Sequence, residues 1–68
     1  MKLTEEQKRE ILRKILSIEA RERLARIRLA KPEFAEKVEE ILIKLFLTGK
    51  IKDQLSDEKF KEFLKKLI

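Results

Sequence analysis

The stretch RERLARIRLAKPE, residues 21–33, carries five cations at a density that could hold the phosphates of an anionic partner. On a helix that turns by about 100° per residue, Arg21 and Arg28 lie one above the other. Arg23 and Arg26 lie on the opposite side, so the arginines do not form one continuous cationic wall. Long arginine stems can pack beside core residues while the guanidinium groups reach carboxylates on the next helix. We therefore expect structural roles for Arg21, Arg23 and Arg28.

Apolar residues between these cations form two stripes at helical spacing. We expect both stripes to face the core, with Arg21 and Arg28 between them. The first stripe has Ala20, Leu24 and Ile27, and the second has Ile18, Ala25 and Leu29.

Residues that could perform catalysis are scarce. The chain has no His, Cys, Tyr or Trp, so the usual nucleophile–base pairs and zinc ligand sets cannot be assembled. Glu36, Glu39 and Glu40 share a helical face, but a di-iron bundle would also need Glu-x-x-His ligands. Ser17 and Ser56 stand where helix caps are expected. We expect no enzymatic activity, no cofactor and no metal site.

Helices must position these residues, since Lys, Arg, Glu, Leu and Ile dominate and there is one Gly and one Pro. We predict an all-α fold and one helical-bundle domain over the 68 residues. Its compact three-helix core would comprise about residues 17–30, 32–48 and 56–68, with a looser N-terminal helix over about 4–16.

The predicted helix ends carry recognisable capping residues. Thr4 and Gln7 have the spacing of a capping box, and Ser56 fits the N-cap of the last helix. Pro32 ends the second helix and begins the third, which predicts a tight corner. Gly49 fits the residue that follows the C-cap of the third helix.

The expected core follows from the apolar spacing. The first turns of the first helix, through Glu10, are mostly polar and should project into solvent. The third helix is apolar on most sides and should lie at the centre of the bundle. The connector over 50–55 should return Ile51 and Leu55 to the core. The last helix carries one core-facing stripe of Phe60, Phe63, Leu64, Leu67 and Ile68.

Net charge and hydropathy narrow the class of partner. A net charge of +5 and a pI near 9.7 favour an anionic partner. The absence of Cys suits a reducing cytosol, and neither a signal peptide nor a membrane span is visible, so we expect a cytoplasmic protein. Charged residues make up 46% of the chain, with few labile side chains, a pattern typical of thermophiles. The basic last helix could lie on an anionic membrane, but a core this small needs its apolar stripe.

A helix-turn-helix arrangement does not fit the sequence. Its recognition helix would be residues 32–48, which carry four glutamates and only two lysines. Such a helix would be repelled by a phosphate-lined groove. We exclude sequence-specific recognition of that kind.

The segments EARERLARIRLAKPE, VEEILIKLFLTGKI and EFLKKL resemble the archaeal double-stranded DNA-binding proteins related to eukaryotic programmed cell death protein five. The resemblance covers roughly residues 11–67. The matching residues are Ala20, Arg21, Arg23, Leu24, Ile27, Leu29, Lys31, Pro32, Glu33, Val38, Glu39, Leu42, Ile43, Gly49 and Ile51.

This resemblance implies a helical bundle with a looser N-terminal helix and DNA binding without strong sequence preference. For the eukaryotic relatives it also implies protein partners, among them the cytosolic chaperonin and an acetyltransferase. The family usually has a charged N-terminal extension and a basic C-terminal tail, and both are missing here. If those tails supply much of the phosphate contact, we expect weaker DNA binding or none. Phe46 and Leu47 are larger and more apolar than in relatives, which predicts additional core or a partner surface.

We therefore predict a non-enzymatic, monomeric domain that binds double-stranded DNA without sequence preference. The alternative is a protein-interaction adaptor that binds a chaperonin or a regulator without significant DNA binding. A stable scaffold, truncated or designed, with no activity of its own is a third possibility. The candidate DNA-binding residues are Arg26, Lys31, Lys50, Lys52, Lys65 and Lys66.

Overall fold

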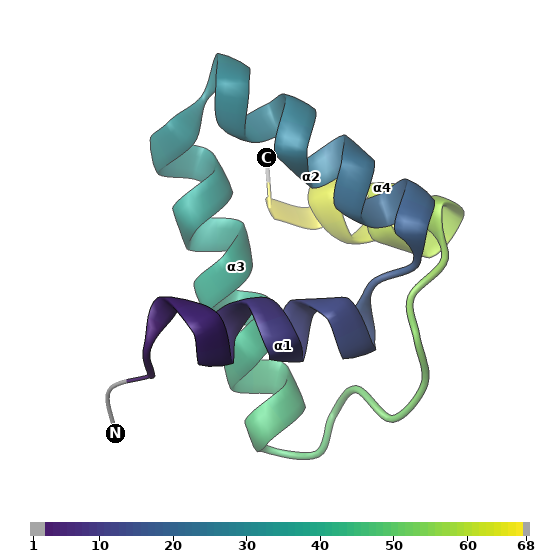
Figure 1. Cartoon of the computed structure of the whole chain (residues 1–68). Coiled ribbons are helices and arrows are strands. Elements are labelled where there is room, and N and C mark those ends of the chain that lie inside the picture. The colour runs from purple at the N-terminus through teal and green to yellow at the C-terminus, as the bar shows by residue number, and fades with distance from the viewer. Residues whose placement is uncertain (1–2, 68) are drawn as a thin grey trace.

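The computed structural model describes residues 3–67, and these residues form four α-helices and no strand (Figure 1). The all-α prediction is confirmed, and each helix begins and ends close to its predicted bounds. Ile68, which we predicted to extend the last core stripe, lies outside the described residues. The helices are α1 (Glu5–Ile15), α2 (Ile18–Ala30), α3 (Pro32–Leu47) and α4 (Asp57–Leu67).

The predicted caps are present. The Thr4 hydroxyl accepts a hydrogen bond from the Gln7 backbone at 3.1 Å, and the Gln7 side chain accepts one from the Thr4 backbone at 2.9 Å. The Ser17 hydroxyl accepts from the backbone of Ala20, three residues on. These bonds satisfy amide groups that have no partner within their own helix.

The corner between α2 and α3 is a single residue. Lys31 ends α2, where its amide donates to Ile27 at 2.6 Å, and it also begins α3, where its carbonyl accepts from Ala35 at 3.0 Å. Pro32 takes the first helical position, where its missing N–H costs nothing. The predicted tight corner is therefore confirmed.

The end of α3 is closed by Gly49, the position predicted for glycine. Its φ of 77° lies in the left-handed region. The Gly49 amide donates to Phe46 at 3.1 Å, and the Lys50 amide donates to Leu45 at 2.8 Å. This pair of bonds is a Schellman motif, which satisfies the last carbonyl groups of the helix.

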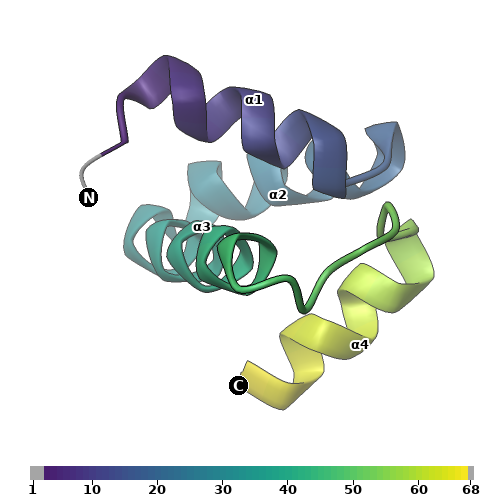
Figure 2. The ribbon, with the colours of Figure 1, turned by 90° about the horizontal axis from the view of Figure 1, so that it is seen from below.

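The connector between α3 and α4 is fastened to the junction of α1 and α2. The Leu55 amide donates to the Ile15 carbonyl at 2.7 Å, and the Ser17 amide donates to the Leu55 carbonyl at 2.9 Å. Figure 2 shows the connector passing this junction before it enters α4. As predicted, Ile51 and Leu55 pack against the core. The backbone pairing was not predicted, because no periodicity marks it.

All four helices contribute to one core. Figure 2 shows α1 and α4 on opposite sides of the layer that α2 and α3 form. The first turns of α1 are exposed as predicted, but Leu12 and Ile15 in its last turn are buried, so α1 is more firmly joined to the core than a looser helix outside a three-helix bundle would be. The buried apolar residues are Leu12, Ile15, Leu16, Ala20, Leu24, Ala35, Val38, Leu42, Ile43, Phe60 and Leu64.

The prediction of two core stripes on α2 is wrong. Leu24 is 4% exposed and belongs to the core, whereas Ile18 is 64% exposed and Leu29 is 87% exposed. Ala25, between these two, is also exposed. The helices that pack on α2 cover one side of it, and residues 3–67 contain no further helix or strand that covers the other side.

The two apolar residues at the end of α3 differ in burial. Phe46 packs against the core as a half-buried residue, and Leu47 is 57% exposed. The additional apolar area noted in the sequence is thus partly core and partly surface.

Candidate nucleic-acid interface

The last turns of α2 are joined to α3 by an ion pair between Arg28 and Glu39. The Glu39 side chain is only 15% exposed, and that of Arg28 is 46% exposed. Two helices that meet at a one-residue corner are thereby also tied along their length. The charge of Arg28 is engaged within the protein.

Arg21 lies on the same side of α2 as Arg28 and is half-buried. Its Nε atom is buried, and among the described residues it has no hydrogen-bond partner. Within residues 3–67, Arg21 also forms no ion pair with a carboxylate.

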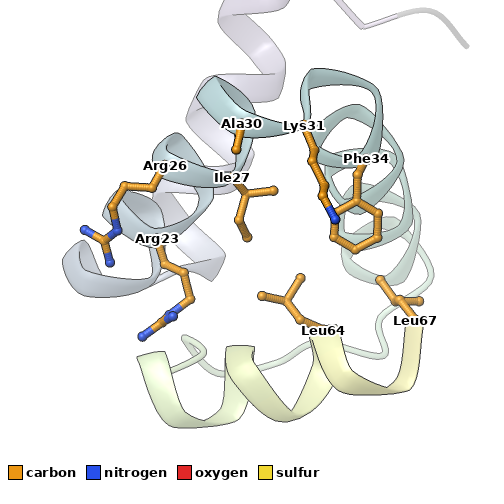
Figure 3. A pocket seen from close by; sticks show the side chains of 8 residues that line it. All are labelled: Arg23, Arg26, Ile27, Ala30, Lys31, Phe34, Leu64 and Leu67. Atoms are coloured by element: carbon orange, nitrogen blue, oxygen red, sulfur yellow. The ribbon is translucent and has the colours of Figure 1, made fainter.

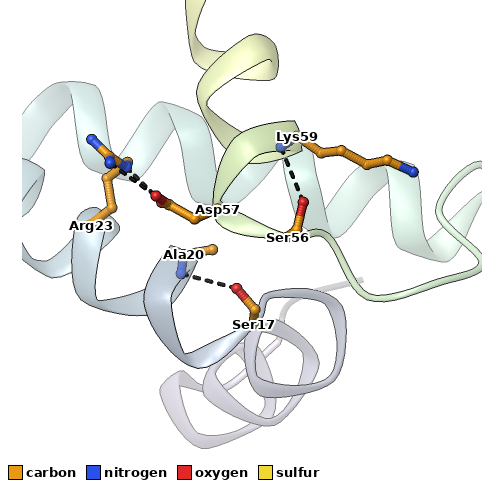
Figure 4. A network of polar contacts seen from close by, with 6 residues as sticks. All are labelled: Ser17, Ala20, Arg23, Ser56, Asp57 and Lys59. Atoms are coloured by element: carbon orange, nitrogen blue, oxygen red, sulfur yellow. Dashed lines mark hydrogen bonds and ion pairs between the residues drawn. The ribbon is translucent and has the colours of Figure 1, made fainter.

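Arg23 forms a double hydrogen bond and ion pair with Asp57 (Figure 4). Its Nε donates to Oδ1 of Asp57 at 2.6 Å, and its Nη2 donates to Oδ2 at 3.0 Å. This two-pronged geometry links α2 to the first turn of α4. Nearby, Ser56 caps α4 by accepting a hydrogen bond from the Lys59 amide at 3.3 Å.

The contact shifts the titration of both partners. The hydrogen bonds from Arg23 lower the pKa of Asp57, and the positive charges of Arg23, Lys61 and Arg26 lower it further, while partial burial opposes the shift. The hydrogen bonds to Asp57 likewise raise the pKa of Arg23. Three cations therefore lie within electrostatic reach of one carboxylate.

A groove of about 660 Å³ runs between α2 and α4 (Figure 3). Of its eight lining residues, three are cations, five are apolar and none is acidic. In Figure 3 the apolar side chains converge on the groove, and Arg23 and Arg26 lie at one end of it. The lining residues are Arg23, Arg26, Ile27, Ala30, Lys31, Phe34, Leu64 and Leu67.

The groove brings together part of the predicted set of DNA-binding residues. Arg26 and Lys31 line it from α2 and the corner. Lys65 and Lys66 stand in the last turn of α4, between the lining residues Leu64 and Leu67. All four cations are exposed, and none forms an ion pair with a carboxylate within residues 3–67.

Lys50 and Lys52 lie elsewhere. They follow the last turn of α3, whereas Lys31 precedes its first turn. A helix of 16 residues is about 24 Å long, so these lysines stand at the opposite end of the molecule from the corner. Both are exposed.

Sequence reasoning did not select Lys61. This residue is exposed and lies four positions after Asp57 on α4, so the two side chains share a helical face. The four-residue spacing shows from sequence alone that Lys61 lies beside Asp57. The sequence does not show that this face of α4 packs near Arg23 and Arg26.

A family model described as the double-stranded DNA-binding domain matches residues 1–68. The chain belongs to this family. The resemblance expected from the segments around the Lys-Pro corner is therefore confirmed.

Relatives in the family are named as DNA-binding proteins. One from Methanocaldococcus jannaschii is 60% identical over 63 residues, which are 93% of this chain and 58% of the relative. One from Pyrococcus abyssi is 53% identical over 62 residues, 91% of this chain and 54% of the relative. One from Saccharolobus islandicus is 52% identical over 63 residues, 93% and 53% of the two chains. The chain thus spans little more than half the length of these relatives.

Two further properties bear on this DNA-binding domain. Between residues 3 and 67, no helix is both long enough and apolar enough to cross a membrane. The same part of the chain holds no group of three or more acidic side chains arranged to bind a metal ion.

Proposed function

We propose that this domain binds double-stranded DNA without sequence preference, through Lys and Arg contacts to phosphate groups. The observation that carries the proposal is the groove between α2 and α4, which has a cationic rim and no acidic lining residue. Membership of a DNA-binding family and the net charge of +5 support it. Neutralising phosphates releases condensed counterions, so affinity should fall steeply with salt.

The proposed contacts fall into two groups by position. Arg26 and Lys31 at the groove, with Lys65 and Lys66 on the adjacent turn of α4, form the primary group. Lys50 and Lys52, at the far end of α3, form a secondary group that a longer duplex could reach.

We further propose that the chain has no catalytic activity and acts as one domain, as a monomer in the cytoplasm. The absence of His and Cys removes the usual nucleophile–base pairs. One core shared by four helices supports a single folding unit. A DNA partner and a chain without cysteine support the cytoplasm.

The test is a titration of two unrelated labelled duplexes of equal length, followed by fluorescence anisotropy at about 50 and about 200 mM salt. We expect equal affinities for the two sequences, with Kd about 10⁻⁴–10⁻⁶ M at physiological salt. The double variant Arg26→Gln/Lys31→Gln should weaken binding to both duplexes. It should reduce the slope of log K against log salt by about two.

A matched control removes two cations that do not line the groove. Lys37 and Lys59 are both exposed, and in Figure 4 the Lys59 side chain points away from Arg23 and Asp57. Their replacement by Gln should change the affinity less than the groove variant does. Absence of binding at low salt, or binding that salt does not weaken, would contradict the proposed function.

The adaptor function is a second candidate, favoured by the apolar floor of the groove and the exposed Leu29. A protein partner would then be retained by the immobilised domain after nuclease treatment. Ala30→Glu places a charge on the exposed edge of the groove and should abolish that retention. If nuclease treatment abolishes the retention, the protein was held through DNA, and DNA is the partner of the domain.

A further inference from the structure

Asp57 is the carboxylate at the centre of a cationic cluster. It accepts two hydrogen bonds from Arg23, and the charges of Lys61 and Arg26 also act on it. Arg23 and Arg26 come from α2, whereas Lys61 comes from α4. The cluster therefore exists only because these two helices pack together.

The geometry of the Arg23–Asp57 contact is also the geometry with which arginine binds phosphate. A guanidinium group presents parallel N–H donors that match two oxygen atoms of either a carboxylate or a phosphate. The Arg23 and Asp57 side chains are 31% and 28% exposed, so an anion from solution can approach the pair. Arg26 and Lys61 are exposed beside it and, within residues 3–67, form no ion pair.

The charges in the cluster favour a phosphodiester over the carboxylate alone. Asp57 neutralises one of the three cations, and two positive charges remain beside it. A phosphate that took the place of the Asp57 carboxylate would lie in the field of the same three cations, and Arg26 and Lys31 line the groove beside it.

We propose that Arg23, Arg26 and Lys61 form a phosphodiester-binding site whose guanidinium fork is held in the free protein by the Asp57 carboxylate. DNA binding then exchanges one anion for another on Arg23, and Asp57 turns to solvent. This inference rests on the proposed function. It adds that Asp57 sets the affinity for DNA. Breaking the Arg23–Asp57 pair costs free energy that DNA binding must offset, so Asp57 limits the affinity.

The test compares two substitutions that each remove one negative charge from the first turn of α4. Asp57→Asn weakens the hold on Arg23, and Glu58→Gln changes an exposed neighbour that forms no ion pair with Arg23. Duplex affinity is measured by anisotropy across a salt series. We expect Asp57→Asn to tighten binding about fivefold to tenfold at low salt, because no ion pair must be broken before Arg23 contacts a phosphate. Glu58→Gln should tighten binding less than about twofold, because it frees no cation.

A third variant tests the location. Asp53→Asn makes the same charge change in the exposed connector, near Lys52. Equal gains for Asp57→Asn and Asp53→Asn would overturn the inference, since binding would then respond to net charge alone. In that outcome the proposed function would stand, because DNA is still bound. No binding by any of the proteins would instead overturn the proposed function.

A measurement on the unmodified protein covers the case in which Asp57→Asn disturbs α4. The NMR signal of the Arg23 Nε–H group reports the hydrogen bond to Asp57. We expect this signal to shift as a duplex is titrated in, while the Nε–H signal of Arg28, paired with Glu39 on the other side of α2, stays unchanged. An Arg23 signal that does not move at saturating DNA would overturn the inference.

Discussion

Leu24 and Leu29 belong to the same helix and each to an apolar stripe at helical spacing, yet Leu24 is 4% exposed and Leu29 is 87% exposed. Nothing in their immediate sequence separates them, since each stands among arginines and alanines. The difference is that α3 and α4 pack on the side of α2 that carries Leu24. Apolar spacing indicates that a helix exists, but its neighbours decide which side of it is buried.

Within residues 3–67, two ion pairs of α2 mark the edges of its buried side. Arg23 and Arg28 flank the stripe of Ala20 and Leu24 when the helix is viewed along its axis. Arg23 reaches Asp57 on α4, and Arg28 reaches Glu39 on α3. Each arginine is thus paired with the helix that packs on its own side, so the pairs favour one rotation of α2 over the alternative that would bury Leu29.

The largest expected effect tests the two leucines directly. Leu24→Ala should lower the free energy of unfolding by about 2–4 kcal/mol, because it removes buried methyl groups and leaves a cavity. Leu29→Ala should change it by less than about 0.5 kcal/mol, because the side chain is already in water. Urea denaturation of both variants measures the difference. Equal losses would mean that the outer side of α2 is buried in solution.

An intermediate effect is expected from the pair at the α3 edge. Glu39→Gln should lower the free energy of unfolding by about 0.5–1 kcal/mol, since the carboxylate is mostly buried but Arg28 can turn to solvent. Glu36→Gln, an exposed change on the same helix, serves as the control and should stay within about 0.5 kcal/mol of the parent. Thermal unfolding in low salt detects the difference. A larger loss for Glu36→Gln would show that α2 is not oriented by this pair.

The smallest expected effect concerns pH at the α4 edge. Because the pKa of Asp57 is lowered in the folded protein, the unfolded chain takes up this proton at a higher pH than the folded one. The contribution of Asp57 to stability is therefore complete above the ordinary carboxyl pKa of about 4 and is lost as the pH falls through the lowered value. The stability advantage of the parent over Asp57→Asn should shrink from about pH 6 to about pH 3. A constant advantage over this range would contradict the pKa shift.

Much of the fold could be predicted from local chemistry. Thr4 with Gln7, Ser17, Pro32 and Gly49 each act within a few residues of their own position, so sequence alone placed the helix ends. The second apolar stripe of α2 was misjudged because its environment depends on segments far away in the chain. The pairing of Leu55 with the α1–α2 junction escaped prediction for the same reason.

The candidate site was only partly accessible from sequence. Exposure of Arg26 and Lys31 followed from helical spacing and from the corner at Pro32. The groove did not, because it requires the packing of α4 against α2. Asp57 and Lys61 looked like ordinary surface charges until that packing placed them beside Arg23.

The two backbone bonds of Leu55 make a latch between segments that lie on either side of α2 and α3 in the chain. Both bonds join residues that are far apart in the chain, so we expect the latch to close late in folding. The amides of Ser17 and Leu55 should consequently exchange with solvent deuterium only when the whole bundle opens. Amides in the exposed first turn of α1 would exchange through local fraying, which makes the latch a built-in reporter of global unfolding.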